Sequence, residues 1–590
     1  MAEPEASKRI KFGTPLWGER FLNRILYGVY GAAMALILIL CLMAGSVQYH
    51  DKDLEKPTGL LVFAVSLILV AGFCCLAAKP ERKQEKQAGK GWGFLAVSLV
   101  FLVLQVLWVR GYYFQTGWDA GTIMKSAVIL ANGESLKDYN WYYSTYPNNL
   151  VLLLLYSNEI RLFRWLHIAP SFGIVLVQCL LSWGTGLLLY GTTQNLLKDS
   201  RAAMAAWGLY VLLVGLSPWV SIPYSDSTAL IFPIAILYLY TRQKQQKGWK
   251  KACLWGAIGL LTMLGYHIKP QVAIATIAIC GIELWNGLFR LRECLRSKST
   301  WCGAAGFAAG IWLMAALMSA GFGTLPLEID SEQTLDITHW WMMGMNDGET
   351  NGAFNQSDCD FSRSISDREE RKQANIEEAL RRIQEMGPGG FLNLMHRKAL
   401  TNYNDGTFCW GGEGGFYVES LADQNLPWAP AAQKLYGGTL TQEATGEGTV
   451  YALFYRAEWV LWMSILLCGA LGALLGLKKP RTQAAAAMLS VLGLTLFEQL
   501  FEARARYLYS YTPVYILLAA MGLLECKNRL TGRGLAATQA DARTRSAENG
   551  TAKRFCSTRI QRITTSGETI RRRIRNWCPR FPIRMPHPAL

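Results

Sequence analysis

Residues 91–120 read GWGFLAVSLVFLVLQVLWVRGYYFQTGWDA and pass from an uninterrupted apolar run into a polar stretch with a single carboxylate. The apolar part, which ends at Val109, has the length of a helix that crosses a hydrocarbon core of about 30 Å. A soluble helix would alternate polar and apolar faces instead. This stretch therefore predicts a membrane-spanning helix that delivers Asp119 to the membrane surface.

Similar apolar runs recur along the chain, which has 590 residues and is 51% hydrophobic. The first run is too long for a secretory signal core and lacks a clear cleavage site. We therefore expect an all-α polytopic membrane protein whose partner is the lipid bilayer. Thirteen candidate segments begin near Phe21, Gly59, Gly91, Leu150, Ser171, Ala202, Ser227, Ala252, Gln271, Cys302, Trp459, Ala484 and Tyr507.

Short basic loops should face the cytoplasm. The clearest lie at 79–90, 241–251, 290–298 and 478–481, and the C-terminal tail is basic as well. The cytoplasmic assignments of these loops contradict one another if all thirteen segments cross the membrane. Removing Leu150–Trp165 from the crossings restores agreement, because its second half carries two arginines, a glutamate and an asparagine, which suit a helix lying in the interface. We expect a bundle of about 12 transmembrane helices with both termini in the cytoplasm.

This topology divides the chain into five parts and places a polar, α-rich domain outside the cell. Within that domain, Ser366 is expected to cap a helix, with Glu369 completing the capping box and Gly387–Gly390 ending it. The parts are 1–90, an N-terminal segment with two extra transmembrane helices; 91–322, the main transmembrane module; 323–458, the extracellular domain; 459–525, the C-terminal transmembrane helices; and 526–590, a basic cytoplasmic tail.

The net charge of +16 is concentrated in the tail, where Lys527–Leu590 holds 15 Lys and Arg against 3 Asp and Glu. Such a run is typical of a disordered, solvated segment or of attraction to anionic lipid heads. Nucleic-acid binding is not expected, since no binding module accompanies the charge. The 14 cysteines show no paired spacing for zinc or redox chemistry. Only Cys359 and Cys409 fall in a large polar segment, where a disulfide between them is an option.

Asp119 and Asp226 each lie on the predicted outer side, where an apolar segment begins. A carboxylate at the bilayer surface can accept a proton from a hydroxyl held within about 3 Å. Either residue could instead be a simple helix N-cap, and the residues alone leave both readings open. Trp118 is expected to anchor its loop at the interface, and Ala120 and Gly121 to leave room beside the carboxylate.

Four basic side chains share the predicted outer side: His267 and Lys269 in GYHIKPQ, and Arg504 and Arg506 in FEARARYLY. Such side chains can hold a lipid phosphate, for which the planar fork of arginine is well suited. They can also snorkel to the interface without any function. Their spacing does not separate these readings.

The order of these elements resembles the membrane-embedded GT-C glycosyltransferases, which include protein mannosyltransferases and the aminoarabinose transferase of lipid A, and especially the related wall-polymer enzymes of Gram-positive bacteria. GWDAGTIMKSA (117–127) resembles the family's acidic motif in the first outer loop, and YSTYPNNLVLLLLY (143–156) is similar to its Pro-bearing juxtamembrane helix. LSPWVSIPYSDS (216–227) is similar to the second outer loop. HIKP (267–270) and EARARYLY (502–509) match later outer positions near the lipid phosphate.

The resemblance covers about Gly91–Leu524 and implies a transferase whose donor is a polyprenyl-phosphate monosaccharide. The acceptor would be an extracytoplasmic glycan, lipid or protein at a bacterial cytoplasmic membrane. Asp119 would be the general base of an inverting displacement, and Asp226 would orient its surroundings or the acceptor. The donor phosphate would be held by Lys269, Arg504, Arg506 and His267.

The acidic motif departs from the family in holding a lone Asp rather than an acidic pair. A second metal-coordinating carboxylate is therefore not carried over; a divalent metal stays open as an alternative, and no cofactor is assigned.

We expect the outer domain to select the acceptor. The residues proposed to line that cleft are Tyr146 and Asn148, and Asn346, Asp347 and Glu349 in MGMNDGETNG (343–352). The alternative reading of this loop is a set of Gly-rich turns between small helices.

Three other functions compete with this one. A flippase or transporter for a lipid-linked sugar would need ionisable residues in mid-membrane, whereas the middles of the predicted spans are almost free of them. An oligosaccharide ligase or polymerase with a lipid-pyrophosphate donor is poorly separated by sequence. A non-enzymatic scaffold would leave the placement of Asp119, Lys269 and Arg506 unexplained.

Overall fold

The computed structural model describes residues 17–44, 46–49, 52–55, 57–78, 88–243, 246–348, 350–412, 416–436 and 449–532. Glu349 and the tail beyond residue 532 lie outside the described residues, so the predictions made for them stay predictions. The chain divides into two units, Met1–Cys526 and Lys527–Leu590.

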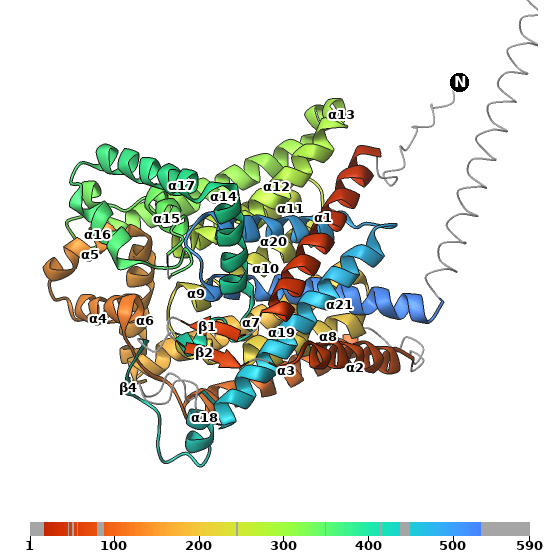
Figure 1. Ribbon diagram of the computed structural model, residues 1–590, viewed down its shortest axis with the longest axis horizontal. Coiled ribbons are helices and arrows are strands. Elements are labelled where there is room, and N and C mark those ends of the chain that lie inside the picture. Colours follow the sequence, from red (N-terminus) through yellow and green to blue (C-terminus); the bar gives the residue numbers. More distant parts are fainter. Residues whose placement is uncertain are drawn as a thin grey trace, which may run out of the picture. The chain divides into compact units, whose positions relative to one another are not determined.

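Helices account for most of the described chain (Figure 1). The long helices are α1 (Trp17–Met43), α2 (Gly59–Ala78), α3 (Ala88–Val109), α7 (Pro170–Leu197), α11 (Trp249–Ile268), α12 (Ala273–Leu288), α14 (Lys298–Phe322), α17 (Arg368–Tyr403), α19 (Thr449–Gly476), α20 (Thr482–Leu500) and α21 (Thr512–Leu530). The remaining helices are α4 (Trp118–Asn132), α5 (Asn140–Thr145), α6 (Leu150–Trp165), α8 (Ser200–Tyr210), α9 (Ser225–Thr228), α10 (Ile231–Gln243), α13 (Leu291–Arg296), α15 (Ile337–Gly344), α16 (Gln356–Ser364) and α18 (Ala429–Tyr436). Two antiparallel strand pairs accompany them, β1 (Ser46–Tyr49) with β2 (Lys52–Glu55) and β3 (Phe114–Thr116) with β4 (Tyr417–Ser420).

Nine helical stretches in the described chain are long and apolar enough to cross a membrane. They are Gly18–Met43, Gly59–Leu76, Trp92–Val109, Pro170–Leu197, Pro270–Leu288, Lys298–Phe322, Val450–Gly476, Thr482–Leu500 and Ala505–Leu530. The predicted crossings near Ala202, Ser227 and Ala252 fall outside this set. The all-α polytopic class is thus confirmed, and the count of twelve stays a prediction.

Helix α10 begins after a break in the helical backbone for a physical reason. It has 13 residues and is separated from α9 by a turn at Ala229–Leu230. The ring of Pro233 would clash with the carbonyl group four residues earlier, that of Ala229, so regular helix cannot pass through this point.

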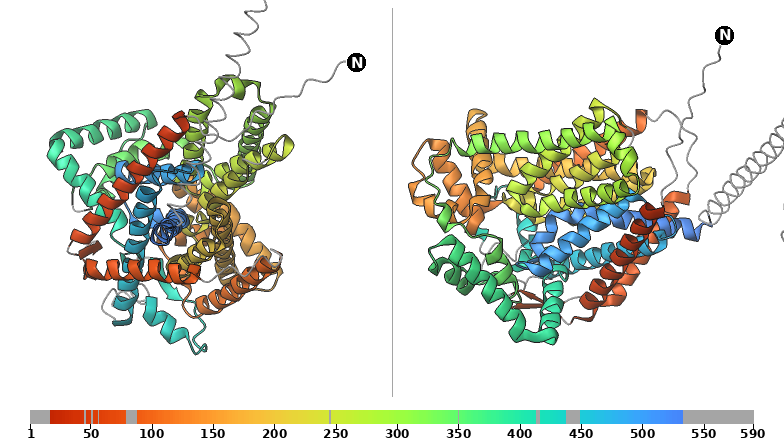
Figure 2. Two further views of the ribbon diagram at one scale, coloured as in Figure 1. Left: turned by 90° about the vertical axis from the view of Figure 1, so that its right-hand side faces the viewer. Right: turned by 90° about the horizontal axis from the view of Figure 1, so that it is seen from above.

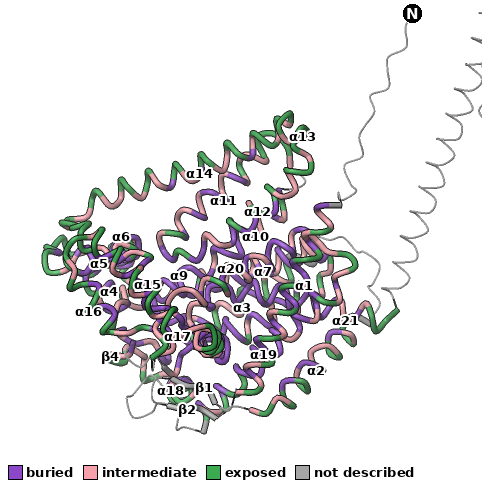
Figure 3. The backbone as a smooth tube through the Cα atoms, turned by 45° about the horizontal axis from the view of Figure 1, so that its top comes forward, coloured by how far each residue is buried: buried purple, intermediate pink, exposed green. Residues whose placement is uncertain are grey.

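The described flanks of the basic loops gather at one end of the helices, here called the basic-loop end. The indole of Trp285, in the helix before the 290–298 loop, donates to the carbonyl oxygen of Gly18 over 3.0 Å. Arg290 pairs with Glu19 at 4.0 Å. Thr482, which follows the 478–481 loop, donates to the same carboxylate over 2.7 Å. Figure 3 shows α14 running from α13, at this end, toward α5 and α6 at the other.

The helices differ in how deeply they lie within the bundle. In Ala505–Leu530, 94% of the most apolar part is buried, whereas in Lys298–Phe322 the share is 11%. Helix α21 is therefore central and α14 peripheral. Helix α14 packs on α11 through glycines: a Cβ atom on Gly310 would lie 2.0 Å from the carbonyl oxygen of Gly256. Such small residues let two apolar helices approach closely where lipid offers no hydrophobic drive for association.

Helices α15, α16 and α17 lie close together, at the end of α14 opposite α13 (Figures 1 and 2). The N-cap of α17 is Asp367, whose carboxylate accepts the N–H of Glu370. The prediction of Ser366 as the cap was wrong by one residue. Gly387 breaks the regular helix with φ of 60°, a conformation that glycine adopts at low cost, and Pro388 begins the second half.

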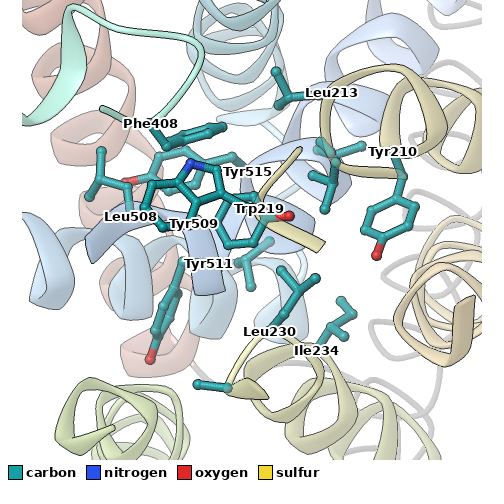
Figure 4. Close-up of a cluster of buried hydrophobic side chains, with 14 of the residues drawn as sticks. Tyr210, Leu213, Trp219, Leu230, Ile234, Phe408, Leu508, Tyr509, Tyr511 and Tyr515 are labelled. Carbon is teal, nitrogen blue, oxygen red and sulfur yellow. The ribbon is translucent and has the colours of Figure 1, made fainter. Parts of the chain in front are cut away.

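The loop predicted as a second outer loop is buried. Every residue from Ser217 to Leu230 is buried. Figure 4 shows Trp219 packed among Phe408, Leu508 and Tyr509, and the Trp219 indole donates to the carbonyl oxygen of Thr407 over 3.0 Å. This packing fixes the segment that leads into Asp226.

Candidate active site around Asp119 and Asp226

Asp119 lies in the first turn of α4, and it does not cap that helix. The N-cap residue is Gly117. The two carboxylate oxygens of Asp119 are held separately: Tyr142 donates its hydroxyl to Oδ1 over 2.9 Å, and Tyr224 donates its hydroxyl to Oδ2 over 3.2 Å. The Asp119 side chain is only partly buried. Two buried phenols therefore orient a carboxylate that solvent can still reach.

The backbone before Asp119 is tightly folded. Trp118 has φ of 50°, a left-handed conformation that is costly for a bulky residue. The residue is 53% exposed, and its ring lies 5.5 Å from that of Phe416. A Cβ atom on Gly121 would lie 2.3 Å from the carbonyl oxygen of Thr116. Gly121 thus permits a close backbone contact, and the expectation that it leaves room beside the carboxylate stays a prediction.

The two phenols are themselves held in place and stay protonated. Asn149 donates its amide to the Tyr142 oxygen over 2.9 Å. Burial and the nearby Asp119 carboxylate raise the pKa of Tyr142 and of Tyr224 well above the ordinary value. Both hydroxyls are therefore donors to Asp119 at every physiological pH.

Asp226 is fully buried and forms ion pairs with two cations. Lys269 donates to its Oδ1, and Arg506 donates to its Oδ2 over 2.8 Å. The N-cap of this helix, α9, is Tyr224, so the simple cap reading of Asp226 was wrong as well. Burial alone would raise the pKa of Asp226, but the two cations outweigh it and hold the pKa below the ordinary value.

Aromatic rings join the two carboxylate centres. The ring of Tyr507 lies 4.5 Å from the Lys269 ammonium and 4.8 Å from the Arg506 guanidinium. The Arg506 guanidinium also lies 5.7 Å from the ring of Tyr224, the residue that donates to Asp119. Cation–π contacts of this kind stabilise buried cations without neutralising them. A single connected set of side chains thus extends from Asp119 to Lys269.

The other two predicted phosphate ligands lie beside this set rather than within it. Arg504 is buried and directly precedes the 3-10 helix η9 (Ala505–Tyr511), where its carbonyl oxygen accepts the N–H of Tyr507. His267 packs edge-on against Tyr266 and Phe322, with ring centroids 5.9 and 5.7 Å away.

The residues predicted to line an acceptor cleft are separated in the structure. Tyr146 is near Asp119, because its ring lies 5.5 Å from that of Tyr142. The exposed Asn148 donates to the side chain of Asn149 over 3.2 Å. Asn346 donates to Asp358 over 2.9 Å, and Asp347 accepts through its carbonyl oxygen from Arg397 over 3.0 Å. No hydrogen bond links these two loop residues to Asp119 within the described chain.

The two cysteines of the polar segment are not joined to each other. Cys359 Sγ lies 3.9 Å from Nε2 of His339, whereas the backbone N–H of Cys409 donates to Asp405. Burial raises the pKa of Cys359 to about 11, so this thiol is not an activated nucleophile.

Lys398 connects α17 to the segment that carries Arg504 and Arg506. It is fully buried, and its ammonium donates to the carbonyl oxygens of Gly344 over 2.8 Å and Phe501 over 2.6 Å. These carbonyl groups end α15 and follow α20, where a cation is favoured by the helix dipoles. The N–H of Ala503 donates to the carbonyl oxygen of Gly352 over 2.8 Å.

Sequence reasoning missed the phenols, which the structure places at the centre of the site. Tyr224 lies within a motif quoted for the resemblance and Tyr142 directly precedes another, but tyrosines near a membrane surface are more readily read as interfacial anchors. Lys398 carries no local signal, because it falls within an amphipathic helix rich in charges.

The arrangement offers an oriented carboxylate beside a pair of buried cations. Within the described residues, no three His, Cys, Asp or Glu side chains lie close enough together to hold a metal ion. The carboxylate can take a proton from a hydroxyl, and the cations can stabilise an anion.

Residues 19–527 match the model of a family described as a conserved hypothetical integral membrane protein. All the residues of the candidate site lie within this range. No curated protein matches the chain.

Proposed function

The chain belongs to this family of integral membrane proteins, and from that premise we propose that it is a GT-C-type glycosyltransferase. It would transfer a monosaccharide from a polyprenyl-phosphate donor to an extracytoplasmic glycan, lipid or protein. One observation carries the proposal: a solvent-accessible carboxylate, Asp119, is held by two phenols next to the buried Asp226–Lys269–Arg506 set. The order of the sequence motifs supports the same reading.

In the proposed reaction, an acceptor hydroxyl gives its proton to Asp119 while its oxygen bonds to the anomeric carbon of the sugar. The bond between that carbon and the phosphate oxygen breaks, and its electron pair leaves with the polyprenyl phosphate. Displacement from the opposite face inverts the anomeric centre. Tyr142 and Tyr224 keep the carboxylate oriented. A general base is efficient because it is held in position.

The leaving phosphate needs positive charge that is already in place. Arg506 has five N–H donors and Lys269 has three, and both cations are held beside Asp226. Asp226 would therefore act as a positioning residue, since it keeps two cations in a buried site where each would otherwise be costly. The leaving anion would meet donors that need no rearrangement.

The proposed location is a bacterial cytoplasmic membrane, with the site on the outer side and both termini inside. Support comes from the basic-loop end, because short basic loops favour the cytoplasmic side and Asp119 lies at the other end of the bundle. A lipid-borne sugar on the outer leaflet would then reach Asp119 from the membrane surface.

Purified full-length protein incubated with a polyprenyl-phosphate sugar labelled in the sugar tests this function. The wild type should release polyprenyl phosphate and transfer the label, and Asp119→Asn should lose this activity. Asp138→Asn, in an exposed turn of the same loop, is the matched control and should retain it. Near-normal turnover by Asp119→Asn would refute the assignment of the base. Activity only with a pyrophosphate-linked donor would favour a ligase or polymerase, and transport without release would favour a flippase.

A further inference from the structure

A second cation is connected to Asp119 indirectly, through the rings of Tyr142 and Tyr146. Arg363, in α16, donates to the hydroxyl oxygen of Tyr146 over 2.7 Å, and its guanidinium carbon lies 5.8 Å from the centre of that ring. The Arg363 side chain is exposed, and among the described residues it makes no ion pair with a carboxylate. Most N–H donors of Arg363 therefore face solvent, while the bond to Tyr146 holds the guanidinium in place.

A row of aromatic rings connects this guanidinium to the base. The row consists of Tyr142, Tyr146 and Trp340. The ring of Tyr146 lies 5.5 Å from that of Tyr142 and 6.4 Å from that of Trp340. Tyr146 and Trp340 are partly exposed, and such rings offer flat, rigid apolar faces with a polar edge. The C–H faces of sugar rings pack on surfaces of this kind.

The two oxygens of Asp119 therefore lead to two different cation sites. Through Oδ2, Tyr224 leads to Arg506 and Lys269, the proposed phosphate site of the donor. Through Oδ1, Tyr142 and then Tyr146 lead to Arg363. An acceptor whose hydroxyl meets Asp119 from this second side would extend over the aromatic row toward the guanidinium.

We propose that Arg363 and the aromatic row form an acceptor subsite that selects a glycan bearing a carboxylate or a phosphate group. This inference rests on the proposed function and adds the acceptor class to it. The guanidinium fork matches both anions through paired N–H bonds. The reacting hydroxyl and the recognised anion would lie on different units of the acceptor, because Tyr146 lies between Asp119 and Arg363.

Binding measurements on the full-length protein in neutral phosphatidylcholine nanodiscs test this subsite. Three probes of similar length are compared by calorimetry: a glycerol-phosphate oligomer, a glucuronate oligomer and a neutral glucose oligomer. The wild type should bind at least one anionic probe about tenfold more tightly than the neutral one, which corresponds to one charge-assisted bidentate contact. The two anionic probes separate phosphate recognition from carboxylate recognition.

Arg363→Gln should remove this preference and leave binding of the neutral probe unchanged, while Arg363→Lys should keep only part of it. Arg381→Gln is the matched control, because Arg381 is a similarly exposed arginine that already pairs with Glu378 and Glu385. Equal binding of all probes by the wild type would overturn the inference. So would loss of undecaprenyl-phosphate binding in Arg363→Gln, since Arg363 would then belong to the donor site.

The same protein samples are assayed for release of polyprenyl phosphate from a polyprenyl-phosphate sugar. If the wild type turns over donor but shows no anionic preference, the acceptor inference alone fails. If the wild type turns over no donor, the proposed function fails, whichever probe binds.

Discussion

The hydroxyl of Tyr224 lies 3.2 Å from Oδ2 of Asp119. The same tyrosine is the N-cap residue of α9, the helix that carries Asp226 in its first turn, and its ring lies 5.7 Å from the guanidinium of Arg506. One side chain therefore sets the position of the proposed base relative to the proposed phosphate site. Catalysis by positioning requires such a connection, because an error of about 1 Å can cost about a hundredfold in rate.

Removal of one phenol oxygen should weaken this connection without removing the base. We expect Tyr224→Phe to lower kcat by roughly tenfold, the effect of losing a hydrogen bond to a charged group worth about 1.5 kcal/mol. Tyr142→Phe should act similarly, and the double variant should exceed either. Tyr190→Phe is the control, since Tyr190 stacks on Phe94 at 3.9 Å in another part of the bundle. Unchanged kcat in Tyr224→Phe would contradict the positioning role.

Asp226→Asn should be destabilising, because Lys269 and Arg506 would lose their shared counter-charge. The expected cost is about 3–5 kcal/mol, the range for breaking a buried ion pair. The pKa of Asp226 in the folded state is below its ordinary value, so the unfolded state binds more protons as the pH falls. The advantage of the wild type is therefore complete above pH ~4 and declines below it.

Thermal unfolding of the solubilised wild type and Asp226→Asn between pH 3 and pH 7 measures this difference, with the pH range set about the ordinary carboxyl pKa of ~4. A stability gap that stays constant down to the acid limit, or the absence of any gap at neutral pH, would show that the ion pairs contribute little.

Lys398→Met should loosen the contact between α17 and the segment after α20. Two buried carbonyl groups lose their donor, at a cost of about 1–3 kcal/mol. Burial lowers the pKa of Lys398 to about 7, although Glu498 and Glu502 oppose this. Between pH ~7 and ~10 the unfolded lysine holds a proton that the folded one lacks, so the wild type should gain stability over the variant as the pH rises. Unfolding midpoints measured across this pH range, with the exposed Lys372→Met as control, test whether the stability difference grows as the pH rises.

How well the sequence predicts a feature depends on how far apart in the chain the interacting residues lie. Hydropathy acts within one segment, so most spans were predicted from composition. The cap of α17 was off by one residue because Ser366 and Asp367 are both good N-caps. The Asp119–Tyr224 contact joins residues that are 105 positions apart. It depends on burial of the loop Ser217–Leu230, which contains Trp219. No local pattern contains that information.

Gly310→Ala should force α14 away from α11, because the added Cβ would lie 2.0 Å from the carbonyl oxygen of Gly256. We expect a loss of about 1–3 kcal/mol, typical of overpacking. Gly281→Ala in α12 is the matched control: a Cβ there meets nothing within 4 Å, and alanine favours helix. Unfolding midpoints of the two variants in the same detergent should therefore move in opposite directions. Similar midpoints would mean that the two helices can separate at no cost.

The proposed orientation predicts which side of the membrane each end of the bundle faces. In a background without native cysteines, a cysteine at Lys137 should react with a membrane-impermeant maleimide on intact cells, since this exposed residue lies in the loop that follows Asp119 and α4. A cysteine at Arg292, exposed in α13 at the basic-loop end, should react only after permeabilisation. The reverse pattern would place Asp119 on the cytoplasmic side, where a donor on the outer leaflet could not reach it. Because helix packing alone is symmetric with respect to the two sides of a bilayer, this labelling decides between them independently of any assay of sugar transfer.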